Sequence, residues 1–491
     1  MLHTQRSRRE FLKAVAAVGS ALPIARPAFG FQPSPALEAY PLLAPQLRAL
    51  ADRRAHPIPR RGTLTLTATD GAYAPDLAQL DVEAAGGTAR QVAPDGLLMF
   101  TVEADEPVYL SAELDLDPSD DLRPGLRATV LCDDTVIAAP MVAAPPWGIA
   151  EITDPAPQVL GTRPPATISV DRWLLPGGRH RLTIAGPHFR DAGRFRALRL
   201  SPLPDLVEAP RYRFALIGDT HVRFEGRHLW MNLKMGEDVT AEFGATLRSL
   251  AREGIDFVMH GGDMTENATR DEFALFAGIV GSQPLPIYGC MGNHDVYLES
   301  SRPDALELLG DLFPGGTLNY ALPRPPLRFV VLDVKIEEPE ARDDQRAWLR
   351  DTLMADRQTP TIVVWHYAPF NRGGLSSCGF RLHDWSVLGR EAVLDIVRAA
   401  PNVIATLNGH DHWDEVNELQ GIHHIQNAAV VEWPNSYRVF RVYADRLEWE
   451  VRQVRNRGYI RESFVVPKAN SWMIATRGSD LQGRISLARR R

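Results

Sequence analysis

Aspartate, asparagine and histidine recur in five short segments of the second half of the chain, and four of these segments contain glycine. Ten of the 14 histidines lie between His221 and His424. Imidazole, carboxylate and amide oxygen ligands suit divalent zinc, iron, manganese or cobalt. The pattern therefore indicates a metal site. The five segments are Gly218-Asp219-Thr220-His221, His260-Gly261-Gly262-Asp263, Gly292-Asn293-His294-Asp295, His366, and Asn408-Gly409-His410-Asp411-His412.

Each segment follows a predicted strand, so the strands would position the candidate ligands. In layered α/β proteins the loops after the carboxyl ends of strands meet at one crevice. Strands alternate here with stretches of helical periodicity, which predicts α/β layering with helices over the sheet faces. The predicted strands are 213–217, 256–259, 285–288, 329–332, 361–365 and 403–407, the helices are 241–252, 271–280, 344–354 and 391–399, and a hairpin is expected at 437–454.

Taken in order, these segments resemble the full motif set of the calcineurin-like metallophosphoesterase superfamily, over residues 211–435. Gln345, Trp348 and Leu349 also resemble a Gln-x-x-Trp-Leu helix common in that superfamily. The separations between the motifs are similar to those of class III cyclic-nucleotide and glycerophosphodiester phosphodiesterases. Purple acid phosphatases are less similar, because Met264-Thr265-Glu266 follows Asp263 where they carry a metal-binding tyrosine.

The resemblance implies a four-layer αββα sandwich that holds two divalent metal ions of the Fe, Zn, Mn or Co class, about 3.5 Å apart. One metal would be held by Asp219, His221 and His412, and the other by Asn293, His366 and His410. Asp263 would bridge them, with each carboxylate oxygen facing one cation. Asp219 and His221, like His410 and His412, are two residues apart, so in extended backbone they point to one side.

The activity expected from the resemblance is hydrolysis of phosphoesters, most of all phosphodiesters, by a metal-bridging hydroxide. His294 would act as general acid, and Asp295 would hold its imidazole in the right tautomer. Two alternatives are an exported phosphomonoesterase that scavenges phosphate and a glycan- or surface-binding protein with a vestigial phosphoesterase domain. The formal charge of -7 argues against bulk neutralisation of nucleic acid.

Other residues near the motifs have weaker claims. His260 is expected beside a ligand rather than as one, and His423 or His424 would either line the pocket or be solvated strand residues. Arg223 could clamp a phosphoryl oxygen and Trp413 could stack on a base or sugar, or both could be packing at the rim. Cys378 lies in a glycine-rich loop, 371–379, that could cover the site.

Residues 7–13 resemble a twin-arginine (Tat) export signal, with Arg8 and Arg9 before an apolar stretch too short to span a bilayer. The expected partners are thus the Tat machinery and a small phosphoester, and the expected location is periplasmic or secreted. Residues 1–28 carry five basic residues and one acid, so their removal takes the formal charge from -7 to about -11. No later apolar run is long enough for a membrane span. Three cysteines cannot form a disulfide framework.

The expected organisation has five parts. Between the signal and the metal motifs, short alternating segments separated by glycine-rich turns predict an all-β sandwich. That domain would be structural, or would bind carbohydrate or a surface. The parts are the signal at 1–28, a linker with a short helix (37–52) at 29–60, the β-sandwich at 61–208, the metallophosphoesterase domain at 209–466 and a frayed C-terminal tail at 467–491.

Overall fold

A computed structural model of the chain describes residues 55–67, 69–74, 90–91, 96–117, 125–126, 128–139, 141–142, 167–185, 194–229, 233–333, 343–369, 390–463 and 481–488. The predicted export signal, the predicted helix at 37–52 and the loop around Cys378 lie outside these residues. Among the described helices, none has the length and hydrophobicity needed to cross a bilayer.

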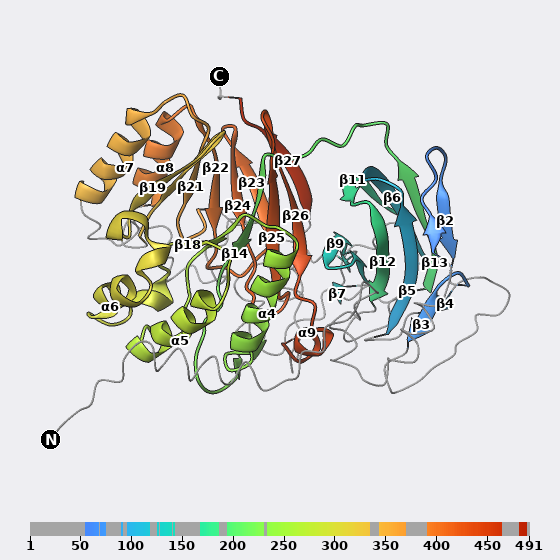
Figure 1. Ribbon diagram of the computed structural model, residues 1–491, viewed down its shortest axis with the longest axis horizontal. Coiled ribbons are helices and arrows are strands. Elements are labelled where there is room, and N and C mark those ends of the chain that lie inside the picture. The colour runs from blue at the N-terminus through green and yellow to red at the C-terminus, as the bar shows by residue number, and fades with distance from the viewer. Residues whose placement is uncertain are drawn as a thin grey trace.

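The C-terminal half, residues 212–486, contains two sheets packed face to face (Figure 1). In the first sheet, three parallel strands are continued by an antiparallel pair and a last strand. These are, in spatial order, β18 (Ile287–Gly289), β17 (Phe257–His260), β14 (Tyr212–Ile217), β25 (Ser436–Val442), β26 (Arg446–Gln453) and β27 (Gln482–Ser486).

The second sheet has a parallel centre flanked by antiparallel edge strands. Its central strands are continuous apolar runs, as expected of strands buried on both faces. In spatial order the strands are β19 (Tyr320–Arg324), β20 (Leu327–Val331), β21 (Thr361–Val364), β22 (Val403–Asn408), β24 (Ile422–Gln426) and β23 (Glu415–Leu419).

Helices cover the outer faces of both sheets (Figure 1). In β17, Phe257 faces the second sheet and its ring centroid lies 5.7 Å from that of Phe329, whereas His260 faces the helices and lies 5.3 Å from Phe276. This alternation follows from the two-residue period of a strand. The first sheet carries α4 (Val239–Arg252), α5 (Arg270–Gly281) and α6 (Ser301–Leu308), the second carries α7 (Asp343–Ala355) and α8 (Arg390–Ala399), and α9 (Arg457–Ser463) follows the hairpin.

The boundaries of these elements have local causes. Helix α5 begins at a capping box. The Thr269 side chain accepts from the Glu272 backbone N–H, and the Glu272 side chain accepts from the Thr269 backbone N–H. Helices α7 and α8 start and end close to their predicted limits. The prediction of a mixed α/β fold is confirmed, because it rested on long, strongly periodic stretches.

The described strands between residues 56 and 202 extend the first sheet and form a separate five-stranded sheet, and they pack around a core including Phe100 and Phe195, whose ring centroids lie 5.9 Å apart. The independent all-β domain stays a prediction, because strand β9 pairs with β26 and so joins these strands to the first sheet of the C-terminal half. The main strands are β2 (Leu64–Thr67), β5 (Leu97–Ala104), β6 (Val108–Asp117), β8 (Thr129–Cys132), β9 (Thr135–Ala138), β11 (Thr167–Leu175), β12 (Gly178–Ala185) and β13 (Arg194–Pro202).

The expectation of a frayed C-terminal tail is wrong for its last described residues. Strand β27 pairs with β26, with Gly483 opposite Trp449. A Cβ atom at Gly483 would collide with the Trp449 ring, so the indole packs directly over the glycine backbone. Ile485 and Leu487 are buried in the same core as β14. Two apolar residues in a polar segment gave too weak a pattern to predict this strand.

Candidate metal centre

The loops that follow five strands meet at one edge of the two sheets. Asp219 follows β14, Asp263 follows β17 and Asn293 follows β18 in the first sheet, while His366 follows β21 and His410 follows β22 in the second. Backbone hydrogen bonds tie the loops together, for example from Gly409 N to the His366 carbonyl (2.9 Å). The carboxyl ends of the parallel strands therefore converge, as the sequence predicted.

The first group of predicted ligands comes together around Asp219. The ligand atoms of Asp219, His221 and His412 all lie within 4.8 Å of one another. His412 Nε2 is 3.2 Å from His221 Nε2 and 3.3 Å from Asp219 Oδ1. All three side chains are buried.

The second group comes together around Asp263. The ligand atoms of Asp263, His366 and His410 lie within 4.8 Å of one another. His366 Nε2 is 3.1 Å from Asn293 Oδ1, which places the predicted amide ligand beside this group. The structure thus brings the members of each predicted ligand set together around Asp219 and Asp263.

Asp263 lies between the two groups, and only one of its carboxylate oxygens faces both of them. Its Oδ2 atom is 3.5 Å from His221 Nε2 and 3.2 Å from His366 Nε2, while Oδ1 accepts the backbone N–H of His294 at 2.9 Å. The expectation that each oxygen faces a different cation is therefore wrong. The loop backbone occupies Oδ1, so the geometry presents a single oxygen to both sides.

Backbone strain is concentrated at these residues. Asp219, His221, Asp263, His410 and His412 have φ values of 52°, 44°, 52°, 76° and 56°, in the left-handed region. Such conformations cost about 1–3 kcal/mol each for residues other than glycine and persist only where the surroundings impose them. Strain at five of seven predicted ligands is typical of a functional site.

Neighbouring glycines allow the close approach. Gly262 has a φ of 96°, and a Cβ atom there would lie 2.5 Å from the His366 ring. At Gly409 a Cβ atom would lie 2.5 Å from Asp219 Oδ2. A side chain at either position would displace a ligand.

The residues present fit a pair of divalent cations. Asp219 Oδ2 is buried and, among the described residues, has no hydrogen-bond partner. An unpaired buried carboxylate oxygen is costly unless a cation compensates it. Around it stand only nitrogen and oxygen donors, which suits zinc, iron, manganese or cobalt.

Nearby carboxylates raise the pKa of the buried imidazoles, and burial lowers it. Burial lowers the pKa of His366, but nearby Asp263 outweighs burial and raises the value to about 9. Burial also lowers the pKa of His412, but Asp219 and Glu432 outweigh it and raise the value to about 10. Burial lowers the pKa of both His221 and His410 to about 3. Protons and metals compete for such ligands, so metal affinity should depend on pH.

Two glutamates that the motifs did not indicate support the histidine ligands. His221 Nδ1 is 2.8 Å from Glu266 Oε2, and His412 Nδ1 forms a short contact with Glu432 Oε1. A carboxylate on the second ring nitrogen fixes the tautomer and orientation of a metal-binding imidazole. Buried Lys234 lies 3.5 Å from Glu266 and 3.4 Å from His221 Nδ1. Glu266 was visible only as the residue three positions after Asp263, and Glu432 has no nearby motif.

His294 lies beside the first ligand group. Its ring centroid is 4.5 Å from that of His221, and its side chain is 21% exposed. Nδ1 is 2.8 Å from the Glu266 carbonyl oxygen, which can only accept, so Nδ1 carries a proton and Nε2 is left for a substrate.

Asp295 does not hold that imidazole, which corrects the prediction. Its buried carboxylate accepts from the backbone of Met264 (3.1 Å), Thr265 (2.8 Å) and Gly292 (2.9 Å), and from the Thr265 hydroxyl. His294 and Asp295 are neighbours in a short 3₁₀ turn, Asn293–Val296, where consecutive side chains point in different directions. Asp295 thus joins two loops of the site.

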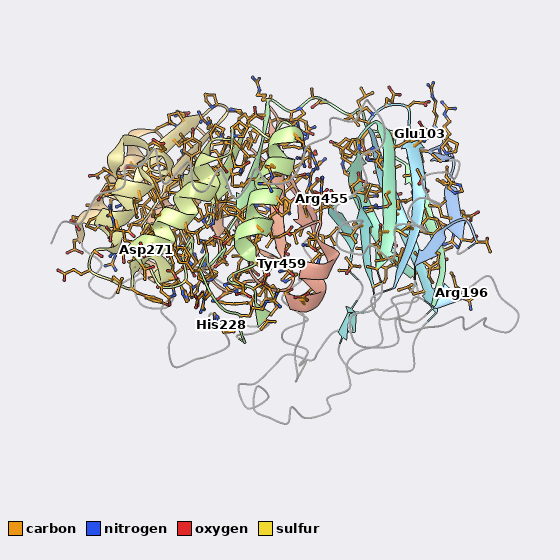
Figure 2. The ribbon with its side chains drawn as sticks, turned by 60° about the horizontal axis from the view of Figure 1, so that its bottom comes forward. Glu103, Arg196, His228, Asp271, Arg455 and Tyr459 are labelled. Carbon is orange, nitrogen blue, oxygen red and sulfur yellow. The ribbon has the colours of Figure 1, made fainter. Side chains whose placement is uncertain are left out.

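The weaker candidates are mostly structural. His260 contacts the Thr220 hydroxyl at 3.2 Å beneath the site. His424 is buried against Thr406, and half-buried His423 lies 3.6 Å from Glu418. Arg223 bonds the Glu225 carbonyl and His228, so it is held within its own loop, and Trp413 is only 9% exposed. His228 Nε2 lies 3.4 Å from Glu266 Oε1, and Figure 2 labels this histidine at the bottom of the C-terminal half.

The comparisons with known proteins agree with this geometry. Residues 212–414 match the family model of calcineurin-like phosphoesterases. A protein described as a probable glycerophosphodiester phosphodiesterase, GpdQ, from Arcobacter nitrofigilis is 24% identical over 201 residues, which are 40% of this chain and 70% of that protein. The family-model match, residues 212–414, covers the five loops of the metal centre up to His412.

Solved structures are more distant. A dimetal phosphatase from Danio rerio has a TM-score of 0.41 and 19% identity, covering 50% of this chain and 96% of its own. A purple acid phosphatase from yellow lupin (Lupinus luteus) has a TM-score of 0.36 and 15% identity, covering 74% and 72%. Neither likeness bears on the activity of this chain.

Proposed function

We propose that the protein is a metal-dependent phosphoester hydrolase that acts on phosphodiesters. One observation carries the proposal: Asp263 Oδ2 lies within 3.5 Å of an imidazole from each of two separate ligand groups. That arrangement suits a binuclear centre held by Asp219, His221, Asp263, Asn293, His366, His410 and His412.

Divalent metals held there would supply Lewis-acid charge neutralisation and a water of lowered pKa. The chain's own residues orient the reactants. The Glu266 backbone carbonyl accepts the Nδ1–H of His294, so His294 gives a proton to the leaving oxygen from Nε2 when the ring is the doubly protonated imidazolium. Tyr297, with a ring centroid 4.9 Å from that of His294, is 55% exposed and forms part of the rim.

Two observations support a diester rather than a monoester as substrate. The curated relative is described as a phosphodiesterase. A monoester carries more negative charge than a diester at neutral pH, and Arg223, the arginine next to the first ligand motif, is held by Glu225 and His228 instead of facing the centre.

The test compares hydrolysis of bis(p-nitrophenyl) phosphate with that of p-nitrophenyl phosphate, with metal analysis of the same preparations. We expect a higher kcat/KM for the diester and about two divalent metals at the centre. His294→Ala should keep metal and lose about 100-fold or more in rate, whereas Asp263→Ala should lose metal.

The control is His423→Ala, a half-buried histidine outside the centre. Normal turnover in Asp263→Ala or His294→Ala would contradict the proposal. A higher kcat/KM for the monoester would retain the hydrolase and replace the substrate class by phosphomonoesters.

We further propose that residues 1–28 direct Tat export, so that the protein works in the periplasm or outside the cell. Consecutive Arg8 and Arg9 before a short apolar stretch support this. Replacing both by lysine should retain the protein in the cytoplasm, as cell fractionation would show. Unchanged export would contradict this part of the proposal and leave the hydrolase untouched.

A further inference from the structure

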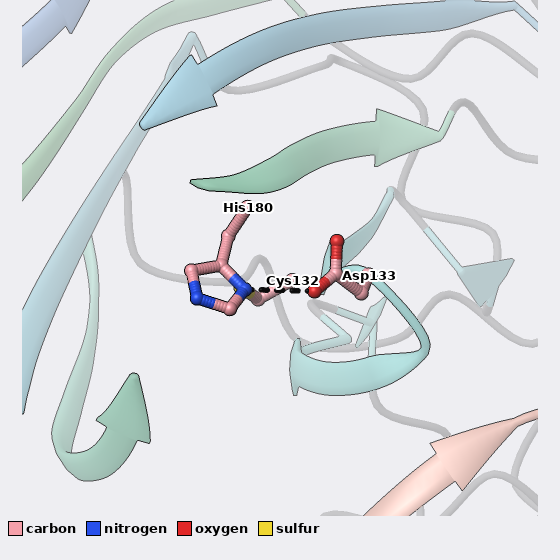
Figure 3. Close-up of side chains that lie close together, drawn as sticks. All are labelled: Cys132, Asp133 and His180. Carbon is pink, nitrogen blue, oxygen red and sulfur yellow. Dashed lines mark hydrogen bonds and ion pairs between the residues drawn. The ribbon is translucent and has the colours of Figure 1, made fainter. Parts of the chain in front are cut away.

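A second group of metal-ligand side chains lies in the N-terminal strands, apart from the centre described above. Cys132 ends β8, Asp133 begins the turn after it, and His180 lies on neighbouring β12 (Figure 3). Leu182 is directly opposite Cys132, so His180, two residues away, projects on the same face of the sheet. The ligand atoms of the three residues lie within 4.8 Å of one another.

The contacts of His180 require either a proton or a metal ion at its Nδ1 atom. Nε2 is 2.9 Å from the Pro176 carbonyl oxygen, which only accepts, so Nε2 carries a proton. Nδ1 of the neutral ring is then a lone pair, and it lies 2.9 Å from Asp133 Oδ2, another acceptor. Two acceptors at this distance are held together by a proton or by a metal ion.

Cys132 favours the metal ion. A proton shared by His180 and Asp133 would need no third group, yet the sulfur of buried Cys132 lies within 4.8 Å of His180 Nδ1 and of the Asp133 carboxylate. Thiolate, imidazole and carboxylate together are a zinc ligand set, and donation of the other ring N–H to a backbone carbonyl is the usual outer contact of a metal-binding histidine.

The surroundings hold the carboxylate ready. Asp133 Oδ1 accepts the Arg181 backbone N–H at 3.0 Å, which leaves Oδ2 for the ion. Asp133 has a left-handed φ of 52°, so the turn keeps a strained conformation at this residue.

A catalytic cysteine is a poorer explanation. A nucleophilic cysteine needs a ring nitrogen of the histidine as its base. Both nitrogens of His180 already face oxygen atoms, one from Pro176 and one from Asp133. The side chains thus form a ligand set and not a catalytic pair.

We propose that Cys132, Asp133 and His180 bind one thiophilic divalent ion such as Zn²⁺, with a fourth position open to water. The next residue, Asp134, accepts from the Tyr437 hydroxyl (3.0 Å) and from Arg455 (3.2 Å) of the C-terminal half. An ion at this site would therefore brace the turn through which the two halves are in contact.

The test uses Co²⁺ as the probe on the full chain after chelation of bound metal. Thiolate ligands give cobalt a charge-transfer band in the near ultraviolet, and the ligands of the phosphoesterase centre contain no sulfur. We expect this band in the unaltered protein, with one more equivalent of metal than the phosphoesterase centre takes. Cys132→Ser should abolish the band, and Asp133→Asn should weaken cobalt binding at this site by about tenfold or more.

Two further variants separate the sites. Asp263→Asn should lose cobalt from the phosphoesterase centre and keep the charge-transfer band, and Cys290→Ser, which changes the other described cysteine, should also keep it. Asp133 is 46% exposed, so its variant should fold even if Cys132→Ser does not. Absence of the band in the unaltered protein, or its persistence in Asp133→Asn with unchanged affinity, would overturn the proposal.

Discussion

His412 lies between two carboxylates, one near the start of the C-terminal half and one 20 positions after His412 in the chain. Its Nε2 faces Asp219, a predicted ligand, and its Nδ1 faces Glu432. Glu432 is fully buried, so its charge acts on the imidazole with little screening by water. This contact makes the ring a better metal ligand and fixes its direction.

Glu432→Gln should therefore weaken metal binding without removing a ligand. We expect an affinity loss of about 10–100-fold at this centre, because the amide can still accept from Nδ1–H but carries no charge. Competition titration with a chromophoric chelator measures it. Glu418→Gln, on an exposed glutamate near His423, is the matched control, and equal affinities in the two variants would show that the charge of Glu432 has no part in metal binding.

At the residue scale, four of the seven candidate ligands could be located because each stands beside a glycine at a strand end. Asp219, Asp263 and His410 illustrate this, since their neighbours permit backbone contact between loops. Glu266 and Glu432 could not be predicted, because their roles depend on a distance across the fold and not on a spacing in the chain. The prediction that Asp295 holds the His294 imidazole was wrong for a related reason, because residues adjacent in sequence point their side chains in different directions in a 3₁₀ turn.

Asp295 matters instead at the scale of the elements, where it joins the loop after β17 to the loop after β18. Asp295→Asn should lower the free energy of unfolding by about 2 kcal/mol or more, since a buried carboxylate that accepts several bonds loses its charge and one acceptor. We also expect weaker metal binding, measured alongside thermal unfolding. His294→Ala, one residue earlier, should affect neither quantity strongly.

A different result for Asp295→Asn would change its role. If Asp295→Asn lost turnover while its stability and metal content stayed unchanged, the result would support a role for Asp295 in catalysis. The comparison with His294→Ala in the same assay separates the two outcomes, because only the histidine has a ring nitrogen available to a substrate.

The elements of the C-terminal half could be predicted wherever burial made the pattern continuous. Strand β21, Thr361–Val364, is buried at every position and was placed almost residue by residue. Helix α6 and the hairpin of β23 and β24 were missed. In Glu415–Leu419 polar residues outnumber apolar ones, and its partner strand supplies the context that the sequence pattern lacks.

At the scale of the whole molecule, hydrogen bonds link an ion-pair network of the C-terminal half to the N-terminal strands. Glu450 on β26 contacts Arg441 (2.6 Å), Arg452 (2.7 Å) and the Thr135 hydroxyl of β9 (3.2 Å). Tyr109 donates to Glu448 at 3.0 Å nearby. Figure 2 shows Arg455 on the side of the C-terminal half that faces the N-terminal strands.

This network should make stability depend on acid pH. Burial raises the pKa of Glu450, but Arg441 and Arg452 outweigh it and lower the value to about 2, from 4.5. A depressed carboxyl pKa stabilises the fold fully above the unfolded value, and the contribution is lost as pH falls from about 4.5 to about 2.

Glu450→Gln should cost about 3 kcal/mol at pH 7, because it leaves buried arginines with fewer partners. The difference from the unaltered protein should shrink at pH 3, where part of the contribution is already lost. Chemical unfolding at both pH values measures this. A difference of equal size at pH 3 and pH 7 would assign the loss to packing and not to charge.

The pairing of β9 with β26 also has a kinetic consequence. Thr135 is aligned with Arg452, and Asp134 bonds Tyr437, 303 positions away. Contacts between such distant parts of a chain form late, because a long loop must close before they yield any free energy. During synthesis on the ribosome, the edge of β9 would remain unpaired until residues 446–453, which form β26, had emerged. Refolding should therefore show a slow phase in which the C-terminal half is already ordered and the N-terminal strands are still exchanging their amide protons.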